Sequence, residues 1–190
     1  MIARNVTSRG RRGLVAVAAA AVMGLGVISS SAPAQAMGTG NPYEDMQVGV
    51  TYTVYQPSYT VGLKTPKRGS QAAECPPGTE ENLRVEYGTK NGLQFSVNEG
   101  NPMCADIGSG ATVMTVMIRG AKASVVAYCD PGSGFTCTRA DVKKQGGHLS
   151  VVMPAASNLR KTTVWIETAG TKNLSARQLV RIARSLHPVQ

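Results

Sequence analysis

The residue types best suited to chemistry in this 190-residue chain are its four cysteines, Cys75, Cys104, Cys129 and Cys137. Cysteines bind zinc when they form CxxC pairs or stand near several histidines, but no CxxC pair occurs and the chain has only two histidines. The N-terminus, described below, reads as an export signal, and an even number of cysteines in an exported chain indicates disulfides. We therefore expect two disulfides and no metal site.

Four cysteines allow three connectivities, and the local patterns favour Cys75–Cys104 together with Cys129–Cys137. The segment between Cys129 and Cys137, DPGSGFT, is rich in turn formers and suits a closed loop. Cys75 and Cys104 lie almost symmetrically about the turn sequence KNG at 90–92, so a bridge between them would join the open end of a hairpin. The other connectivities stay open at this point.

Catalytic chemistry has few candidates. No G-x-S-x-G nucleophile elbow occurs. His148 follows two glycines at the start of an expected strand, and His187 lies at the end of an expected helix, where the helix dipole favours it. Asp106 and Asp130 precede glycine-containing turns, which aspartate commonly forms. A serine–histidine pair stays open, but we expect a protein that is not an enzyme and that has no cofactor.

A ligand-binding face is a further candidate, and Trp165 marks it. In the expected strand 162–168, alternation places two aliphatic side chains on one face and Trp165 on the other. Met114 and Met117, with Met153, are candidates to line the face that carries Trp165. Burial of Trp165 against another part of the chain is the simpler alternative, because methionine is more often a core residue than a ligand contact.

Basic residues form the last set of candidates. Arg177, Arg181 and Arg184 share one side of the expected C-terminal helix, and other basic clusters are Lys64, Lys67, Arg68, Arg139, Lys143 and Lys144. Such a pattern is typical of a solvated surface. The sharper hypothesis is docking to an anionic cell-wall polymer or lipid headgroup. Four arginines and no acidic residue lie in 1–36, so removing this segment lowers the net charge from +9 to +5. No nucleic-acid partner is expected at that charge.

The elements that position these residues are mainly strands. Apolar and β-branched runs separated by Gly, Pro and Asn predict strands at 50–55, 58–63, 83–87, 93–97, 112–119, 123–129, 148–153 and 162–168. Their short connections predict an antiparallel meander of about six to eight strands. In TYTVYQPSYTVGL at 51–63, Pro57 breaks the strand, so both Tyr-Thr-Val copies are expected to turn Tyr and Val toward the core. A short helical turn is expected within 138–147.

The C-terminus carries the strongest helix signal. Ser175 and Gln178 fit a capping box, Leu174 and Leu179 fit a hydrophobic staple, and Pro188 stops the helix. The apolar stripe expected to pack on one face of the sheet consists of Leu179, Ile182, Ala183 and Leu186. The sequence thus predicts an α+β fold, in which an antiparallel sheet is closed by a helix from Ala176 to about Leu186.

Residues 1–36 read as an export signal. Four arginines precede the apolar run LVAVAAAAVMGLGVI, and Ala34 and Ala36 supply the A-x-A pattern of a cleavage site. We expect cleavage after Ala36, by the general or the twin-arginine route, and a secreted mature protein without a transmembrane segment. A loose polar tether is expected at 37–47, followed by a single α+β domain at 48–190.

The ending TTVWIETAGTKNLSARQLVRIARSLHP resembles the close of small secreted envelope proteins of actinobacteria, through Trp165, Leu174, Leu179, Ile182, Ala183, Ser185 and Leu186. It is also similar to the strand-then-helix ending of lipoprotein-carrier-like and RseB-like periplasmic domains. This second resemblance implies a curved sheet with a groove for lipid or lipoprotein. We expect a non-catalytic secreted or envelope binding protein, whose partner is an anionic wall polymer or an envelope protein. A lipid carrier or sensor, and a hydrolase inhibitor built on the loop 130–136, are the alternatives.

Overall fold

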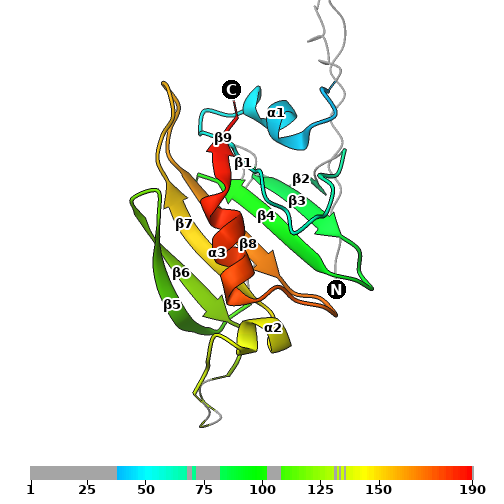
Figure 1. The fold of residues 1–190 in the computed structure, drawn as a ribbon. Coiled ribbons are helices and arrows are strands. Elements are labelled where there is room, and N and C mark those ends of the chain that lie inside the picture. Colours follow the sequence, from blue (N-terminus) through cyan, green and yellow to red (C-terminus); the bar gives the residue numbers. More distant parts are fainter. Residues whose placement is uncertain are drawn as a thin grey trace, which may run out of the picture. The chain divides into compact units, whose positions relative to one another are not determined.

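Antiparallel strands make up most of the fold. The computed structural model describes residues 38–67, 70–71, 82–101, 108–130, 132, 134 and 136–189. Within these residues, seven strands form one antiparallel sheet in the order β2-β3-β4-β8-β7-β6-β5, and β1 and β9 form a separate two-stranded ribbon (Figure 1). The α+β class and the antiparallel sheet are therefore confirmed.

The elements in the seven-stranded sheet are β2 (Ser70–Gln71), β3 (Leu83–Gly88), β4 (Gln94–Gly100), β5 (Ala111–Ile118), β6 (Ala121–Ala127), β7 (Gly147–Met153) and β8 (Thr162–Thr168). The ribbon consists of β1 (Tyr55–Pro57) and β9 (Leu186–Pro188), and the helices are α1 (Pro42–Gln47), α2 (Asp141–Gln145) and α3 (Ala176–Arg184). Six of the predicted strands match β3 to β8 closely, and α2 lies where a helical turn was expected.

The strand order differs from the simple meander that the sequence predicted. β2 to β4 and β5 to β8 are two runs of consecutive neighbours, as in a meander. The two runs join through β4 and β8, with Val97 opposite Ile166, rather than through β4 and β5. Consecutive strands pair by default when a tight turn links them, and β4 and β5 are not linked in this way. β5 consequently forms one edge of the sheet.

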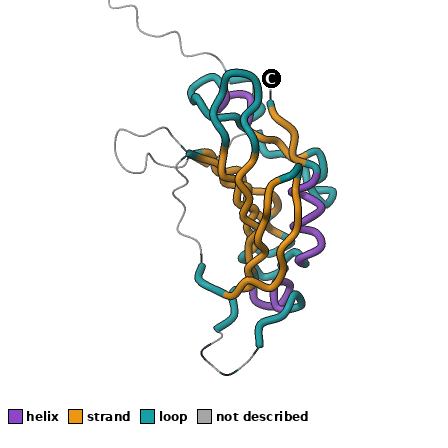
Figure 2. The backbone as a smooth tube through the Cα atoms, turned by 90° about the vertical axis from the view of Figure 1, so that its left-hand side faces the viewer, coloured by secondary structure: helices purple, strands orange, loops and turns teal. Residues whose placement is uncertain are grey.

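The hydrophobic core lies between the sheet and α3, which runs along one face of the sheet (Figure 2). A fully buried row crosses four neighbouring strands and consists of Val97, Ile166, Leu149 and Val125. We call the face that carries this row the front face and the opposite one the back face. The predicted helical stripe is confirmed, since Leu179, Ile182, Ala183 and Leu186 are all fully buried.

The predicted capping box of α3 is also confirmed. The side chain of Ser175 accepts a hydrogen bond from the N–H of Gln178 at 3.3 Å, and Gln178 Oε1 accepts one from the N–H of Ser175 at 2.9 Å. The helix ends at Arg184 instead of near Leu186, because Leu186 starts β9 and pairs with β1. Among the described helices, none has the length and apolar character needed to cross a membrane.

The structure places a helix where the sequence predicted a loose tether. α1 begins after Asn41, whose side chain accepts a hydrogen bond from the N–H of Tyr43, and Pro42 occupies the first helical turn. Both features favour a helix start. Tyr43 is fully buried, and its hydroxyl lies 2.8 Å from that of Tyr87 on β3. This contact between two buried tyrosine side chains packs α1 against the front face.

The two Tyr-Thr-Val copies do not form the two predicted strands. Only Tyr55–Pro57 is a strand, and Pro57 lies in the two-stranded ribbon, where its missing N–H is tolerated. Tyr52 and Val54 of the first copy are fully buried, as predicted. Tyr59 of the second copy is only half-buried, because it lies beside α3 on the surface.

The predicted disulfide between Cys129 and Cys137 is present, with a Cα–Cα distance of 6.1 Å. It closes the loop that leads from the end of β6 toward α2. The predicted pair Cys75–Cys104 lies outside the described residues.

Replacing both Cys129 and Cys137 with serine is expected to lower the free energy of unfolding by up to about 2.6 kcal/mol. The reason is that a short closed loop restricts the unfolded chain, and the chain-entropy relation gives this value for the loop concerned. Urea denaturation of residues 37–190 measures the change. A variant as stable as the unmodified protein would show that the bridge does not stabilise the fold by restricting the unfolded chain.

Candidate functional site

A groove between α3 and the edge strand β5 brings apolar and cationic side chains together. Its volume is about 420 Å³, within the range of about 300–1,000 Å³ usual for small-molecule sites. The apolar lining comes from Met114, Val116, Ala176 and Val180, and the charged lining comes from Arg139, Arg177 and Arg184. We call this site the arginine groove.

The register of the sheet explains the apolar floor of the arginine groove. Met114 lies opposite Val125 and Val116 opposite Ala123, so both side chains point to the front face, on the side of α3. Val125 and Ala123 are fully buried, whereas Met114 and Val116 are only half-buried. The difference follows from the position of β5, since no described strand continues the sheet beyond it.

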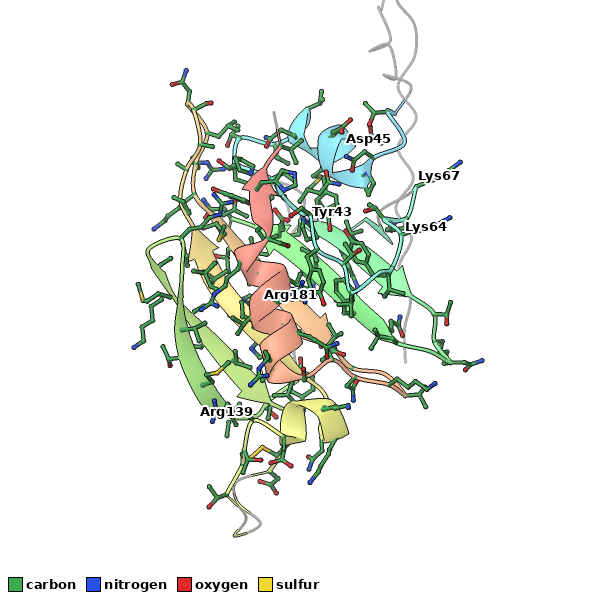
Figure 3. All side chains as sticks on the ribbon, in the orientation of Figure 1. Tyr43, Asp45, Lys64, Lys67, Arg139 and Arg181 are labelled. Atoms are coloured by element: carbon green, nitrogen blue, oxygen red, sulfur yellow. A yellow bond between two sulfur atoms is a disulfide. The ribbon has the colours of Figure 1, made fainter. Side chains whose placement is uncertain are left out.

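Helical spacing explains the charged rim. Arg177, Val180 and Arg184 are three and four residues apart, so they share one side of α3. Arg139 comes from the turn that precedes α2, at the end of the sheet near the start of α3 (Figure 3). The rim therefore combines residues from two separate segments of the chain.

The arginine groove carries a concentrated positive charge. Its three guanidinium groups are charged at any physiological pH, and the side chains are exposed. None of the described residues that line the groove is Asp or Glu. Of the ion pairs formed within the described part of the chain, none involves Arg139, Arg177 or Arg184. These cations are thus available to an external anion.

Arg181, which the sequence grouped with Arg177 and Arg184, does not line the groove. Its guanidinium carbon lies 4.0 Å from the centre of the Tyr59 ring, a cation–π contact. Lys64 and Lys67 lie near α1, far along the molecule from Arg139 beside α2 (Figure 3). The described basic residues do not form one continuous surface, and of the three helix arginines only Arg177 and Arg184 line the groove. Contact of all three with an anionic surface stays a prediction.

The predicted ligand face of Trp165, Met114 and Met117 is also divided. Met114 lines the arginine groove on the front face, and Met153 is fully buried. Met117 lies on the back face at the edge strand, opposite Lys122, and 58% of it is exposed. Trp165 lies on the back face between two other strands. A register of period two places residues three apart on opposite faces, which separates Met114 from Met117.

A polar and aromatic cluster surrounds Trp165 on the back face. Tyr128 donates a hydrogen bond of 2.7 Å to Glu167 Oε1, and the guanidinium of Arg84 lies 3.8 Å from Glu167 Oε2. The ring of His148 lies 5.7 Å from that of Tyr128 and 5.9 Å from that of Trp165, measured between centroids. The three rings therefore form a row across adjacent strands, with a fixed carboxylate beside it.

Burial sets the protonation of this cluster. Burial lowers the pKa of His148, so its imidazole is neutral at pH 7. Burial, followed by the hydrogen bond to Glu167, raises the pKa of Tyr128, so this phenol stays a donor. The buried atoms His148 Nδ1 and Trp165 Nε1 have no hydrogen-bond partner among the described residues.

Apart from the arginine groove and the cluster around Trp165, one acidic side chain, that of Glu99, is enclosed in the core. It is fully buried on the front face, where its Oε2 accepts a hydrogen bond of 2.8 Å from the N–H of Tyr55 and its Oε1 has no partner within the described residues. Burial raises the pKa of Glu99 well above its usual value, and the N–H of Tyr55 offsets this only in part. Its seclusion makes Glu99 a structural residue and not a ligand site.

The sequence did not indicate Val180 in the groove, or Tyr128 and Glu167 in the back-face cluster. It gave Arg139 as part of a basic cluster but did not predict that Arg139 joins the helix arginines. The three-residue spacing of Arg177 and Val180 could have indicated that both lie on the same side of the helix. Alternation in β8 already indicated that Glu167 and Trp165 lie on the same face of the sheet. The positions of Arg139 and Tyr128 depend on how separate strands meet, for which no short motif exists.

Among the described residues, no three His, Cys, Asp or Glu side chains are grouped so as to hold a metal ion. Comparisons of the chain with protein-family models, with curated proteins and with solved structures give no match. The fold and site define a small α+β protein with an arginine-rimmed surface groove.

Proposed function

We propose that the protein is a non-catalytic binding protein of the cell envelope, and that it holds an anionic amphiphile in the arginine groove. The observation that carries this proposal is the combination of an apolar floor with three guanidinium groups in a groove whose described lining contains no Asp or Glu. A phosphate or carboxylate group pairs with arginine through two parallel hydrogen bonds. An alkyl chain gains about 0.8 kcal/mol for each CH₂ that it buries against the floor.

Location outside the cytoplasm is supported by chemistry that the structure contains. The bridge between Cys129 and Cys137 persists in oxidising compartments and is rare in the reducing cytoplasm. The export signal and the cleavage site after Ala36 stay predictions, because they lie outside the described residues. In an envelope, lipids with phosphate headgroups supply the amphiphile that the groove suits. This agrees with the lipidic-ligand alternative drawn from the sequence, although the groove lies between a helix and a sheet edge.

Replacing Arg177 and Arg184 together with glutamine is expected to weaken the binding of dodecyl phosphate by about tenfold or more for each arginine. A hydrogen bond to a charged group contributes about 1.5–3 kcal/mol, and 1.4 kcal/mol is a factor of ten in affinity. Isothermal titration of residues 37–190 below the micelle concentration of the ligand measures the change. Arg181→Gln is the matched control, since Arg181 lies on the same helix but outside the groove, and we expect it to bind normally.

Two further ligands separate the contributions of the charged headgroup and of the alkyl chain to the binding affinity. Dodecyl maltoside has the same alkyl chain with a neutral headgroup and is expected to bind much more weakly. Inorganic phosphate has the charge without the chain, and strong competition by phosphate would point to a wall polymer instead of a lipid. Equal binding by the double variant, or equal binding of dodecyl maltoside, would contradict the proposed function.

A further inference from the structure

Two exposed apolar side chains lie on the back face of the sheet. Within the described part of the chain, the large apolar side chains that stand exposed are Val48, Met117 and Val152. Met117 on β5 is 58% exposed, and Val152 on β7 is 46% exposed. Single exposed apolar residues are ordinary on protein surfaces, whereas neighbouring ones mark an interaction site. The position of Met117 relative to Val152 therefore decides what they indicate.

The register of the sheet places these two side chains in one row. Met117 lies opposite Lys122 on β6. Ala123 pairs with Val151 on β7, so Lys122 and Val152 are the next positions along the same two strands. Side chains directly opposite each other on paired strands have Cβ atoms about 4.5–5.5 Å apart. Met117 and Val152 therefore flank Lys122 on its two sides.

Two lysines give this row a positive charge. Lys122 is exposed between the two apolar side chains, and Lys161 is exposed just before β8, two residues from the Thr163 that lies opposite Val152. Strand alternation places Lys161 on the same face as Thr163. Of the ion pairs formed by described residues, none involves Lys122 or Lys161. We call Met117, Lys122, Val152 and Lys161 the lysine patch.

The carboxylates described on the back face lie at the other end of the sheet. Glu167 is opposite His148, which is four residues from Val152 on β7, or about 13 Å along an extended strand. Glu86 belongs to the same row as Glu167, because Ser96 on β4 pairs with both. The Debye length is about 8 Å at physiological ionic strength. These two carboxylates therefore do not neutralise the lysine patch.

The size and chemistry of the lysine patch suit an anionic bilayer better than a folded protein. A standard protein–protein interface takes about 20–30 residues from each side, and the lysine patch offers four. A bilayer needs no matching shape, since a few apolar side chains enter its interface and its anionic headgroups attract each nearby lysine. Lysine stems also lie along apolar surface while their ammonium groups reach toward phosphates.

We propose that the lysine patch docks the protein on a lipid bilayer that carries anionic headgroups. Met117 and Val152 enter the boundary between headgroups and acyl chains, and Lys122 and Lys161 contact the phosphates. The turn between β5 and β6 and the connection between β7 and β8 lie at this same end of the sheet (Figure 1). The lysine patch lies on the face opposite the arginine groove, so this inference goes beyond the proposed function and does not depend on it.

Cosedimentation of residues 37–190 with vesicles tests the docking. We expect binding to vesicles of phosphatidylglycerol and much weaker binding to vesicles of phosphatidylcholine, whose headgroup has no net charge. Each lysine near an anionic surface contributes about fivefold in affinity, so the variant with Lys122→Gln and Lys161→Gln is expected to bind about 25-fold more weakly. Equal binding of the unmodified protein to both kinds of vesicle, or to neither, would overturn the proposal.

A second variant tests the apolar contribution. Met117→Thr together with Val152→Thr keeps residues that favour strands and is expected to weaken vesicle binding about tenfold. Both positions are exposed, so we expect the variant to fold normally. If sedimentation velocity shows the unmodified protein as a dimer that this variant dissolves, the lysine patch is an interface between two copies and the bilayer proposal is wrong.

The arginine groove supplies the matched control. The variant with Arg177→Gln and Arg184→Gln carries the same loss of charge on the front face, and we expect it to bind phosphatidylglycerol vesicles nearly as well as the unmodified protein. The variant with Lys122→Gln and Lys161→Gln should in turn bind dodecyl phosphate normally, which separates the two sites. Vesicle binding that is lost in the arginine variant and kept in the lysine variant would overturn the proposal and assign the contact to α3.

Discussion

Glu99→Gln is expected to raise the free energy of unfolding at about pH 8 while leaving it nearly unchanged at about pH 4. The cause is that Glu99 is fully buried, with only one of its oxygens hydrogen-bonded within the described residues. Burial raises the pKa of this carboxyl in the folded protein well above its value in the unfolded chain. Glutamine has the same shape and cannot ionise.

The sign of the effect follows from proton binding. Below the unfolded pKa of about 4.3, the carboxyl is protonated in both states and the substitution changes little. Above it, the unfolded chain loses this proton while the folded protein keeps it, so the unmodified protein loses stability as the pH rises toward the folded pKa. Over that window the stability difference between Glu99→Gln and the unmodified protein grows by about 1.4 kcal/mol for each pH unit.

Urea denaturation at a series of pH values measures this difference. Glu86→Gln is the matched control, because the Glu86 side chain is 44% exposed and pairs with Arg84 at the surface. An exposed ion pair contributes less than about 1 kcal/mol, so the stability profile of this variant is expected to lie within about 1 kcal/mol of that of the unmodified protein. If the profile of Glu99→Gln runs parallel to that of the unmodified protein, then Glu99 ionises in the folded state and the buried environment described for it is incorrect.

Leu179→Ala is expected to lower the free energy of unfolding by about 2–5 kcal/mol, the usual range for a fully buried leucine. Leu179 has no exposed surface and belongs to the stripe by which α3 packs on β7 and β8. Removing its side chain takes apolar atoms out of the core and leaves a cavity beneath the helix. Alanine also favours helix, so the loss cannot be attributed to helix propensity.

Arg177→Ala is the matched control for Leu179→Ala. It lies on the same helix but is exposed, and we expect a change within about 0.5 kcal/mol. Chemical denaturation at constant pH compares the two variants. Similar stabilities for both would contradict the packing of α3 on the front face. The same control also separates stability from binding, since Arg177→Ala should impair the arginine groove without unfolding the protein.

Features that depend on residues a few positions apart could be predicted from the sequence. The alternating pattern of residues 162–168 identified β8, with Val164 and Ile166 buried and Trp165 on the other face. The pair Ser175 and Gln178 identified the start of α3, because the capping box is closed within one turn. These local rules also located the loop between Cys129 and Cys137.

Features that depend on which segments meet could not be predicted in this way. The pairing of β4 with β8 leaves β5 at an edge of the sheet. Because β5 is at the edge, Met114 stays partly exposed and lines a groove between β5 and α3. The burial of Glu99 likewise depends on the packing of α1 and of the two-stranded ribbon against the sheet. The sequence of β4 alone does not indicate this packing.

The sequence by itself determined the α+β class, the strands β3 to β8, the capped helix and the bridge between Cys129 and Cys137. The tertiary structure alone decided that Arg177 and Arg184 join Arg139 at a groove while Arg181 packs on Tyr59. The tertiary structure also decided that Trp165 and Met114 lie on opposite faces of the sheet. The physical reason is that backbone alternation and capping act within a few residues, whereas a binding site forms where distant strands and helices meet.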